Sequence, residues 1–133
     1  MTAVDSSIVV AAFSSWHEDN ERSLRVLAKR PELPSHVAIE SYSVLTRLPQ
    51  PNRAPPGLVN EFMKYHFPEP VLSLPPSLYA SLLELASDEA ILGGSVYDAL
   101  IAATALHAGA TLITLDRRAA RTYQLVGVTY ELV

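Results

Sequence analysis

The chain has 133 residues, a length typical of one domain, and 49% of them are hydrophobic, which excludes a disordered chain. The absence of cysteine excludes disulfides and thiolate metal sites. A formal net charge of −4 argues only weakly against a nucleic-acid partner, because arginines gather beside some of the acidic residues. No apolar run is long enough to span a bilayer and no signal-peptide pattern opens the chain, so we expect a cytoplasmic protein.

Short apolar runs alternate with amphipathic segments, and prolines and glycines mark the boundaries between them. In chain order, the predicted elements are a strand at 2–5, helices at 8–13 and 19–30, a brief strand near 35, helices at 37–48 and 58–65, a strand at 71–74, helices at 78–86 and 96–105, a strand at 110–115, a helix at 119–125 and a strand at 128–132. This alternation predicts an α/β fold with three layers, in which a short, mostly parallel sheet lies between helices. We expect residues 1–133 to form a single domain.

Local patterns predict a helix cap and three apolar helix faces. Ser6 or Ser7 is expected to cap the helix at 8–13, although Asp5 is a possible cap as well. Two faces expected to turn inward consist of Leu24, Leu27 and Ala28, and of Leu82, Leu83, Leu85 and Ala86. A third face, near Leu45 and Leu48, suits either the core or the surface of a dimer.

Asp98 is an unusual residue for its position in the helix at 96–105. The residues three, four and seven positions further on are Ile101, Ala102 and Ala105, so the carboxylate lies on an apolar stripe. Burial of a carboxylate without a partner costs several kcal/mol. We therefore expect Asp98 to be matched by a cation, a hydrogen-bond donor or a proton.

Three other acids are predicted to lie near Asp98. Asp5 and Asp116 each follow a predicted strand, and in a parallel sheet such positions share one edge. Glu40, like Asp98, lies in the first turn of its helix and points toward the same edge. Clustered carboxylates repel one another unless a cation intervenes, and oxygen ligands favour Mg²⁺ or Mn²⁺ over zinc. An ion held there could activate water for attack on a phosphate.

Three of the four acids also have a purely structural interpretation. Asp5 and Asp116 could simply cap the helices that follow them, and Glu40 could be a partner of the helix dipole. Asp5 could instead be the nucleophile of a phosphatase, but Ser7 stands where enzymes of the haloacid dehalogenase type need a second aspartate. The set of acids is therefore the signal, since no single position is decisive.

Four sequence segments, taken in order, resemble the PIN-domain family and, within it, the VapC-type toxins of toxin–antitoxin pairs. These segments are Val4-Asp5-Ser6-Ser7, Ile39-Glu40-Ser41-Tyr42 with the helix up to Leu48, Tyr97-Asp98-Ala99-Leu100-Ile101-Ala102, and Thr114-Leu115-Asp116. The resemblance covers the whole chain. It implies a PIN-like fold and a type II toxin that is an endoribonuclease, with Mg²⁺ or Mn²⁺ bound by the four acids. It also implies a homodimer silenced by a cognate antitoxin, although a PIN fold that has lost catalysis and only binds a partner remains an alternative.

One departure from the family pattern concerns the number of ions. Many relatives have a further acid shortly after the last motif, where this chain has Ala119 and Ala120. We therefore predict one well-held ion rather than two.

Several further residues are candidates for supporting roles. Ser7 and Thr114 could hydrogen-bond a carboxylate or a phosphate. The arginines that could contact RNA phosphates or an antitoxin are Arg47, Arg117, Arg118 and Arg121. The four histidines are scattered without the spacing of a zinc site, so we expect structural or surface roles for them.

Overall fold

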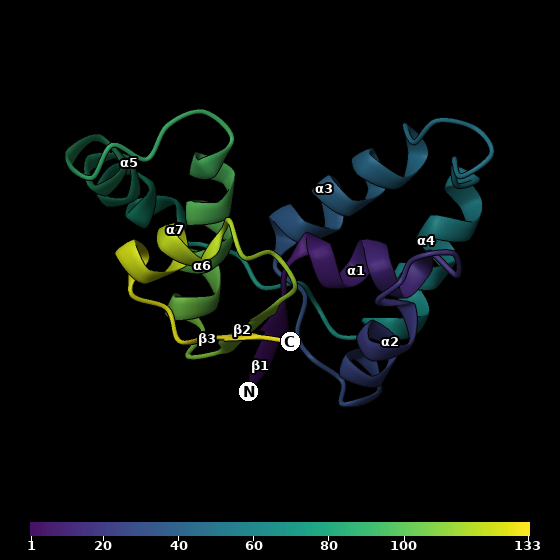
Figure 1. Cartoon of the computed structure of the whole chain (residues 1–133). Coiled ribbons are helices and arrows are strands. Elements are labelled where there is room, and N and C mark those ends of the chain that lie inside the picture. Colours follow the sequence, from purple (N-terminus) through teal and green to yellow (C-terminus); the bar gives the residue numbers. More distant parts are fainter.

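A short parallel sheet organises the computed structural model, which describes all residues from 1 to 133. Its strands are β1 (Thr2–Val4), β2 (Thr111–Thr114) and β3 (Tyr130–Leu132), in the order β1-β2-β3. Ala3 pairs with Leu112, and Ile113 pairs with Glu131. In Figure 1, α5, α6 and α7 lie on one side of the sheet and α1 to α4 lie on the other, which confirms the predicted three-layer α/β fold.

Every predicted helix is present, with boundaries shifted by a few residues. The helices are α1 (Ser6–Phe13), α2 (Asn20–Ala28), α3 (Ser35–Thr46), α4 (Pro56–His66), α5 (Tyr79–Asp88), α6 (Ser95–His107) and α7 (Ala120–Val126), with a 3₁₀ turn, η1 (Pro76–Leu78), before α5. None of them combines the length and the apolar character that a membrane crossing requires.

The strands predicted near Ser35 and at 71–74 are wrong. Each is reduced to an isolated parallel bridge, between Ala3 and Glu32 and between Pro34 and Leu72. Proline cannot donate a ladder hydrogen bond, and prolines stand close to both segments. The first segment therefore touches β1 at one residue, and the second pairs only with the first.

The cap of α1 is Asp5 rather than Ser6 or Ser7. Asp5 has an extended backbone, and its side chain accepts a hydrogen bond from the Ser7 amide, whereas both serines already belong to the helix. The strand end and the helix start are therefore joined through this one carboxylate.

Two of the predicted apolar faces are partly wrong. Leu24 is 38% exposed and Leu83 is 61% exposed, and Ala28 is exposed as well. The inward positions of α2 are Ser23 and Leu27, and those of α5 are Leu82 and Ala86, with Leu85 half-buried. The two residues of each inward pair are four positions apart, so each helix buries only a narrow stripe. The leucines beside that stripe therefore face water. Leu45 is fully buried and belongs to the core.

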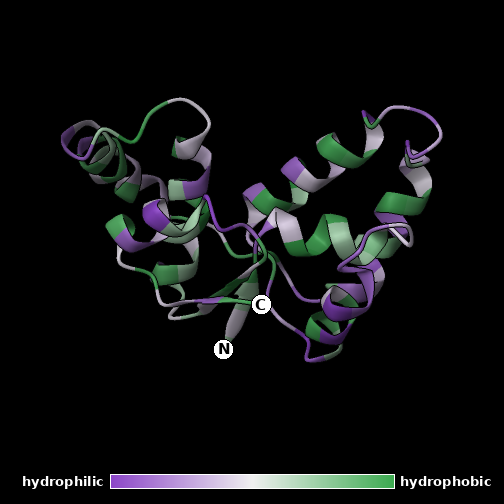
Figure 2. Ribbon diagram, in the orientation of Figure 1, coloured by the Kyte–Doolittle hydropathy of each residue, from purple (hydrophilic) through white to green (hydrophobic).

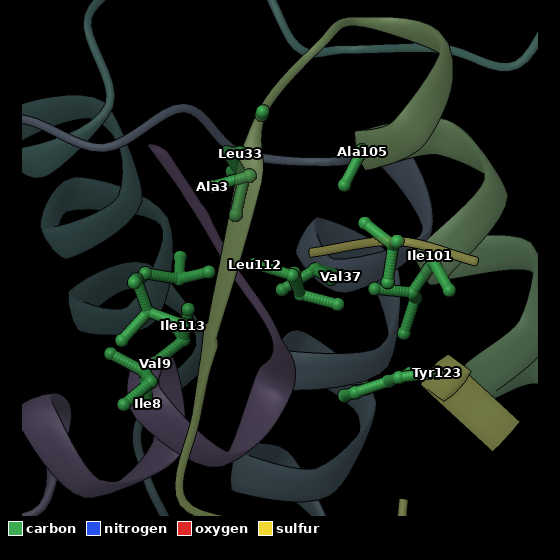
Figure 3. Close-up of a cluster of buried hydrophobic side chains, with 14 of the residues drawn as sticks. Ala3, Ile8, Val9, Leu33, Val37, Ile101, Ala105, Leu112, Ile113 and Tyr123 are labelled. Carbon is green, nitrogen blue, oxygen red and sulfur yellow. The ribbon is translucent and has the colours of Figure 1, made fainter. Parts of the chain in front are cut away.

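The main core is a cluster of 17 buried residues built on both faces of the sheet. Successive residues of a strand point to opposite faces, so Ile113 meets Ile8 and Val9 of α1 while Leu112 turns toward α6 (Figure 3). Strand β2 is hydrophobic, whereas much of α2 is hydrophilic (Figure 2). This packing fixes the sheet edge from which Asp5 and Asp116 project.

Candidate active site

The four predicted acids line one cleft at the carboxyl end of β1 and β2. The cleft has a volume of about 590 Å³ and no hydrophobic side chain in its lining. Its lining residues are Asp5, Ser6, Ser7, Glu40, Gly94, Ser95, Asp98, Asp116 and Arg118. Helices α3 and α6, which carry Glu40 and Asp98, stand on either side of this sheet edge (Figure 1).

Asp5 is the buried corner of the cleft, with only 3% of the residue exposed. Its Oδ1 accepts hydrogen bonds from the amide of Ser7, at 3.0 Å, and from the Ser7 hydroxyl. Its Oδ2 accepts hydrogen bonds from the hydroxyls of Thr114 and Tyr123, the latter at 2.7 Å. Burial raises the pKa of Asp5, although these hydroxyl donors oppose the rise.

Ser7 and Thr114 also connect Asp5 to the backbone after β2. The Ser7 hydroxyl accepts the Leu115 amide at 2.9 Å, and the Thr114 hydroxyl accepts the Asp116 amide at 2.9 Å. Because each hydroxyl accepts from the backbone and donates to Asp5, both its orientation and that of the carboxylate are fixed. The backbone at Asp116 is therefore held in place relative to Asp5 through the Thr114 hydroxyl.

Glu40 is held by one serine that the sequence predicted only as a helix cap and by one histidine. The Ser6 hydroxyl donates to its Oε1, and Nε2 of His36 lies 3.3 Å from its Oε2. The imidazole of His36 in turn stacks on the ring of Tyr97, with centroids 5.1 Å apart and planes 4° from parallel. Because Tyr97 precedes Asp98 on α6, this stack joins the first turns of α3 and α6. Glu40 itself lies in the second turn of α3, not the first as predicted, because the helix begins two residues earlier than expected.

The carboxylate of Asp98 accepts no hydrogen bond from the protein, and the residue is half-buried. Burial, followed by the charges of Glu40, Asp116 and Asp5, raises its pKa to about 6, and Arg118 only partly opposes this. The partner that the apolar stripe led us to expect is therefore not supplied by the protein.

Asp116 and Arg118 form the outer rim of the cleft. Oδ1 of Asp116 accepts the Arg118 amide at 2.9 Å and lies 3.6 Å from Nε of the same arginine, whose side chain is 92% exposed. The other candidate arginines, Arg47, Arg117 and Arg121, are exposed and do not line the cleft. Arg47 instead donates to the Ser43 hydroxyl at 3.0 Å.

His36 and Tyr123 are the site residues that sequence reasoning missed. His36 lies four residues before Glu40, a spacing that places both side chains on one face of a helix and that could have revealed the pair. Tyr123 left no comparable signal, because a tyrosine in a predicted core helix is expected to pack as an aromatic residue.

The donor set of the cleft suits a hard cation. It offers carboxylate and hydroxyl oxygens without sulfur, and burial together with three neighbouring carboxylates raises the pKa of Asp98. No three of the His, Asp or Glu side chains are spaced to bind one ion directly.

Comparison with proteins of known sequence identifies the family. The model of the PIN domain matches residues 2–125. Over 133 residues, all of this chain and 99% of the other, the chain is 41% identical to the protein named Ribonuclease VapC40 of Mycobacterium tuberculosis. It is 35% identical over 127 residues to Ribonuclease VapC27 of the same species, covering 95% of this chain and 92% of that protein.

Solved structures share the fold at low sequence identity. FitAcB from Neisseria gonorrhoeae matches with a TM-score of 0.69 and 18% identity, over 98% of this chain and 96% of that one. VapBC2 from Rickettsia felis, solved with a DNA fragment from its promoter, matches with a TM-score of 0.68 and 19% identity, over 99% and 98% of the two chains. The chain therefore belongs to the PIN-domain family and, within it, to the VapC type.

Proposed function

We propose that this protein is a divalent-metal-dependent endoribonuclease that acts in the cytoplasm as the toxin of a type II toxin–antitoxin pair. The observation that carries the proposal is the convergence of Asp5, Glu40, Asp98 and Asp116 on one polar cleft at a sheet edge. The two relatives named as ribonucleases, similar over nearly the whole chain, support the choice of RNA as substrate.

The four carboxylates would hold Mg²⁺ or Mn²⁺ directly or through water. When bound, such an ion lowers the pKa of a coordinated water and offsets charge on the scissile phosphate. Asp98 and Asp116 are the more accessible acids, whereas Asp5 is buried with both oxygens already hydrogen-bonded. Ser7 and Thr114 would keep Asp5 in position, and Arg118 at the rim would contact a phosphate oxygen of the substrate.

We further propose that the cleft holds one well-ordered ion. Ala119, at a position where relatives have a further acid, is 2% exposed and packs in the core, and Ala120 offers no ligand either. A crystal soaked in Mn²⁺ should contain one fully occupied site. Two fully occupied sites would contradict this part of the proposal.

A cognate antitoxin and a second copy of the chain are the proposed protein partners. The fold matches one chain of the VapBC2 structure over nearly that chain's whole length, which supports an antitoxin as partner. Arg47, Arg117 and Arg121 are exposed outside the cleft, where they would contact the antitoxin or RNA beyond the cut. Purification with the neighbouring antitoxin and measurement of the mass of the complex would test both partners.

A phosphatase with Asp5 as nucleophile is disfavoured by the geometry of Asp5. A nucleophilic carboxylate needs a free, accessible oxygen, but Asp5 is 3% exposed and accepts hydrogen bonds on both oxygens. A catalytically silent binding module is the remaining alternative, and only an activity measurement separates it from an enzyme.

The experiment is cleavage of total RNA with Mg²⁺ or Mn²⁺ by the wild type and by Asp98→Asn. This change keeps the shape of the side chain and removes its charge, so we expect at least a hundredfold loss of cleavage. Asp88→Asn is the matched control, because Asp88 is an exposed residue at the end of α5 and outside the cleft.

The outcomes separate the alternatives. Cutting that requires the metal, survives in Asp88→Asn and disappears in Asp98→Asn supports the nuclease and its site. A folded, partner-free wild type that cuts no RNA would favour the binding module. Equal cutting by all three proteins would mean that the site lies elsewhere or that a contaminant is responsible.

A further inference from the structure

The acid cleft continues past Arg118 into a second recess of about 410 Å³. The two hollows share Ser6, Ser7, Asp116 and Arg118. The residues found only in the recess are Val10, His17, Asp19, Val44 and Leu115. A chain held over the carboxylates can thus extend past Arg118 into this shallow neighbouring hollow.

The chemistry changes from one hollow to the next. The cleft has no hydrophobic lining, whereas the recess has three half-buried apolar side chains, Val10, Val44 and Leu115, contributed by α1, α3 and the end of β2. The carboxylate of Asp19 lies 3.3 Å from the guanidinium of Arg22, so its charge is already matched. The recess is therefore suited to a flat, mostly uncharged group beside an anionic one.

His17 gives the recess a donor of defined orientation. Its Nδ1 accepts a hydrogen bond from the Asp19 amide at 3.0 Å, so in the neutral ring the hydrogen is on Nε2. The half-exposed indole of Trp16 lies against the same imidazole, with centroids 5.8 Å apart. A heterocycle on the apolar side chains could thus present an acceptor to Nε2–H.

We propose that this recess binds the nucleoside next to the scissile phosphate and gives the enzyme a base preference at that position. The proposal rests on the ribonuclease function proposed above. Arg118, which lines both hollows, contacts the linking phosphate, the apolar side chains contact the base, and His17 donates to an acceptor on its edge.

The test is cleavage of a randomised RNA pool, with the cut sites sequenced, by the wild type, His17→Phe and Val44→Trp. His17→Phe keeps a ring but loses the donor, so the base preference at one position beside the cut should fall about three- to tenfold. Val44→Trp fills the recess and should raise KM about tenfold or more with little change in kcat. Matched controls are His107→Phe and Val71→Trp, which alter exposed residues away from both hollows.

The results distinguish this inference from the function on which it rests. A wild type that does not cut RNA overturns the proposed function. A wild type that cuts, with the same base preference and KM in both variants, overturns the nucleoside site alone. Unchanged cleavage together with weaker inhibition by the antitoxin would assign the recess to the antitoxin and likewise overturn the proposal.

Discussion

Asp5 and Asp98 line the same cleft, yet their surroundings are opposite. Asp5 is almost fully buried and accepts hydrogen bonds from Ser7, Thr114 and Tyr123. Asp98 is half-buried, its carboxylate accepts no hydrogen bond from the protein, and it faces the charges of three other carboxylates. The protein therefore satisfies one acid within its own fold and leaves the other to be satisfied from outside.

This difference separates stability from activity within one site. Removal of Asp5 leaves buried hydroxyls without an acceptor, so its cost falls on the fold. Removal of the Asp98 charge relieves repulsion between carboxylates, so we expect it to weaken cation binding rather than to destabilise the fold. The predictions below test this division, beginning with the largest effect.

Asp5→Ala is expected to destabilise the metal-free protein by about 3–5 kcal/mol, because it breaks a buried hydrogen-bonded network around a carboxylate. For a chain of this length, that corresponds to a fall in Tm of roughly 10–20 °C. Thermal unfolding in EDTA measures it. Asp98→Ala is the comparison, with a change in Tm of less than about 4 °C, and equal losses in the two variants would contradict the division.

His36→Ala is expected to weaken Mn²⁺ binding and RNA cleavage by about ten- to a hundredfold, because Glu40 loses one of its two side-chain partners. The binding is measured on RNA-free protein by electron paramagnetic resonance of free Mn²⁺. His36→Gln keeps a donor and should recover part of the affinity. His107→Ala, at the far end of α6, should change nothing, and unaltered Mn²⁺ binding in His36→Ala would exclude a positioning role.

Tyr123→Phe is expected to lower the stability by about 1 kcal/mol and leave most of the activity. The ring stays in the core, and Asp5 keeps its hydrogen bonds from Ser7 and Thr114. Urea unfolding measures the loss, and unfolding of the Asp5→Ala/Tyr123→Phe double variant shows whether the two residues are coupled. Strictly additive losses would mean that the hydroxyl does not stabilise the protein through Asp5.

The parts of the fold that follow from local pattern were predictable. All seven helices and the three strands of the sheet were predicted, because their apolar periodicity and their proline and glycine boundaries are local features. Two strands were predicted wrongly because the sequence of an apolar run between prolines does not show whether the run pairs with a neighbouring strand along its whole length or at a single residue. Leu24 and Leu83 were predicted to face inward because helical spacing does not show how wide a strip of each helix is covered by its neighbours.

The candidate site was predictable in its acids and less so in their partners. Asp5 and Asp116 had to share an edge once the strands were parallel, and Asp98 was conspicuous on its apolar stripe. The hydroxyl of Tyr123 reaches Asp5 from 118 positions away in the chain, and the stack of His36 on Tyr97 depends on how α3 and α6 cross. Contacts of this kind are set by tertiary packing, which no local pattern encodes.

The smallest expected effect is the pH dependence of the metal-free protein. Because the pKa of Asp98 is raised to about 6 from an ordinary value of 3.8, the folded state binds more protons than the unfolded state between these values. Its contribution to stability is therefore greatest below pH 4 and is lost as the pH rises to about 6.

Allowing for partial exposure to solvent, we expect this loss to be about 1 kcal/mol, or roughly 3 °C in Tm. The measurement is Tm from pH 4 to 7 in EDTA, as the difference between the wild type and Asp98→Asn, with Asp88→Asn as the control. Mn²⁺ should abolish the loss above pH 6, because the ion binds the charged form of the carboxylate. A difference that stays flat with pH would mean that neither burial nor the neighbouring carboxylates raise the pKa of Asp98, and would contradict the contrast with Asp5.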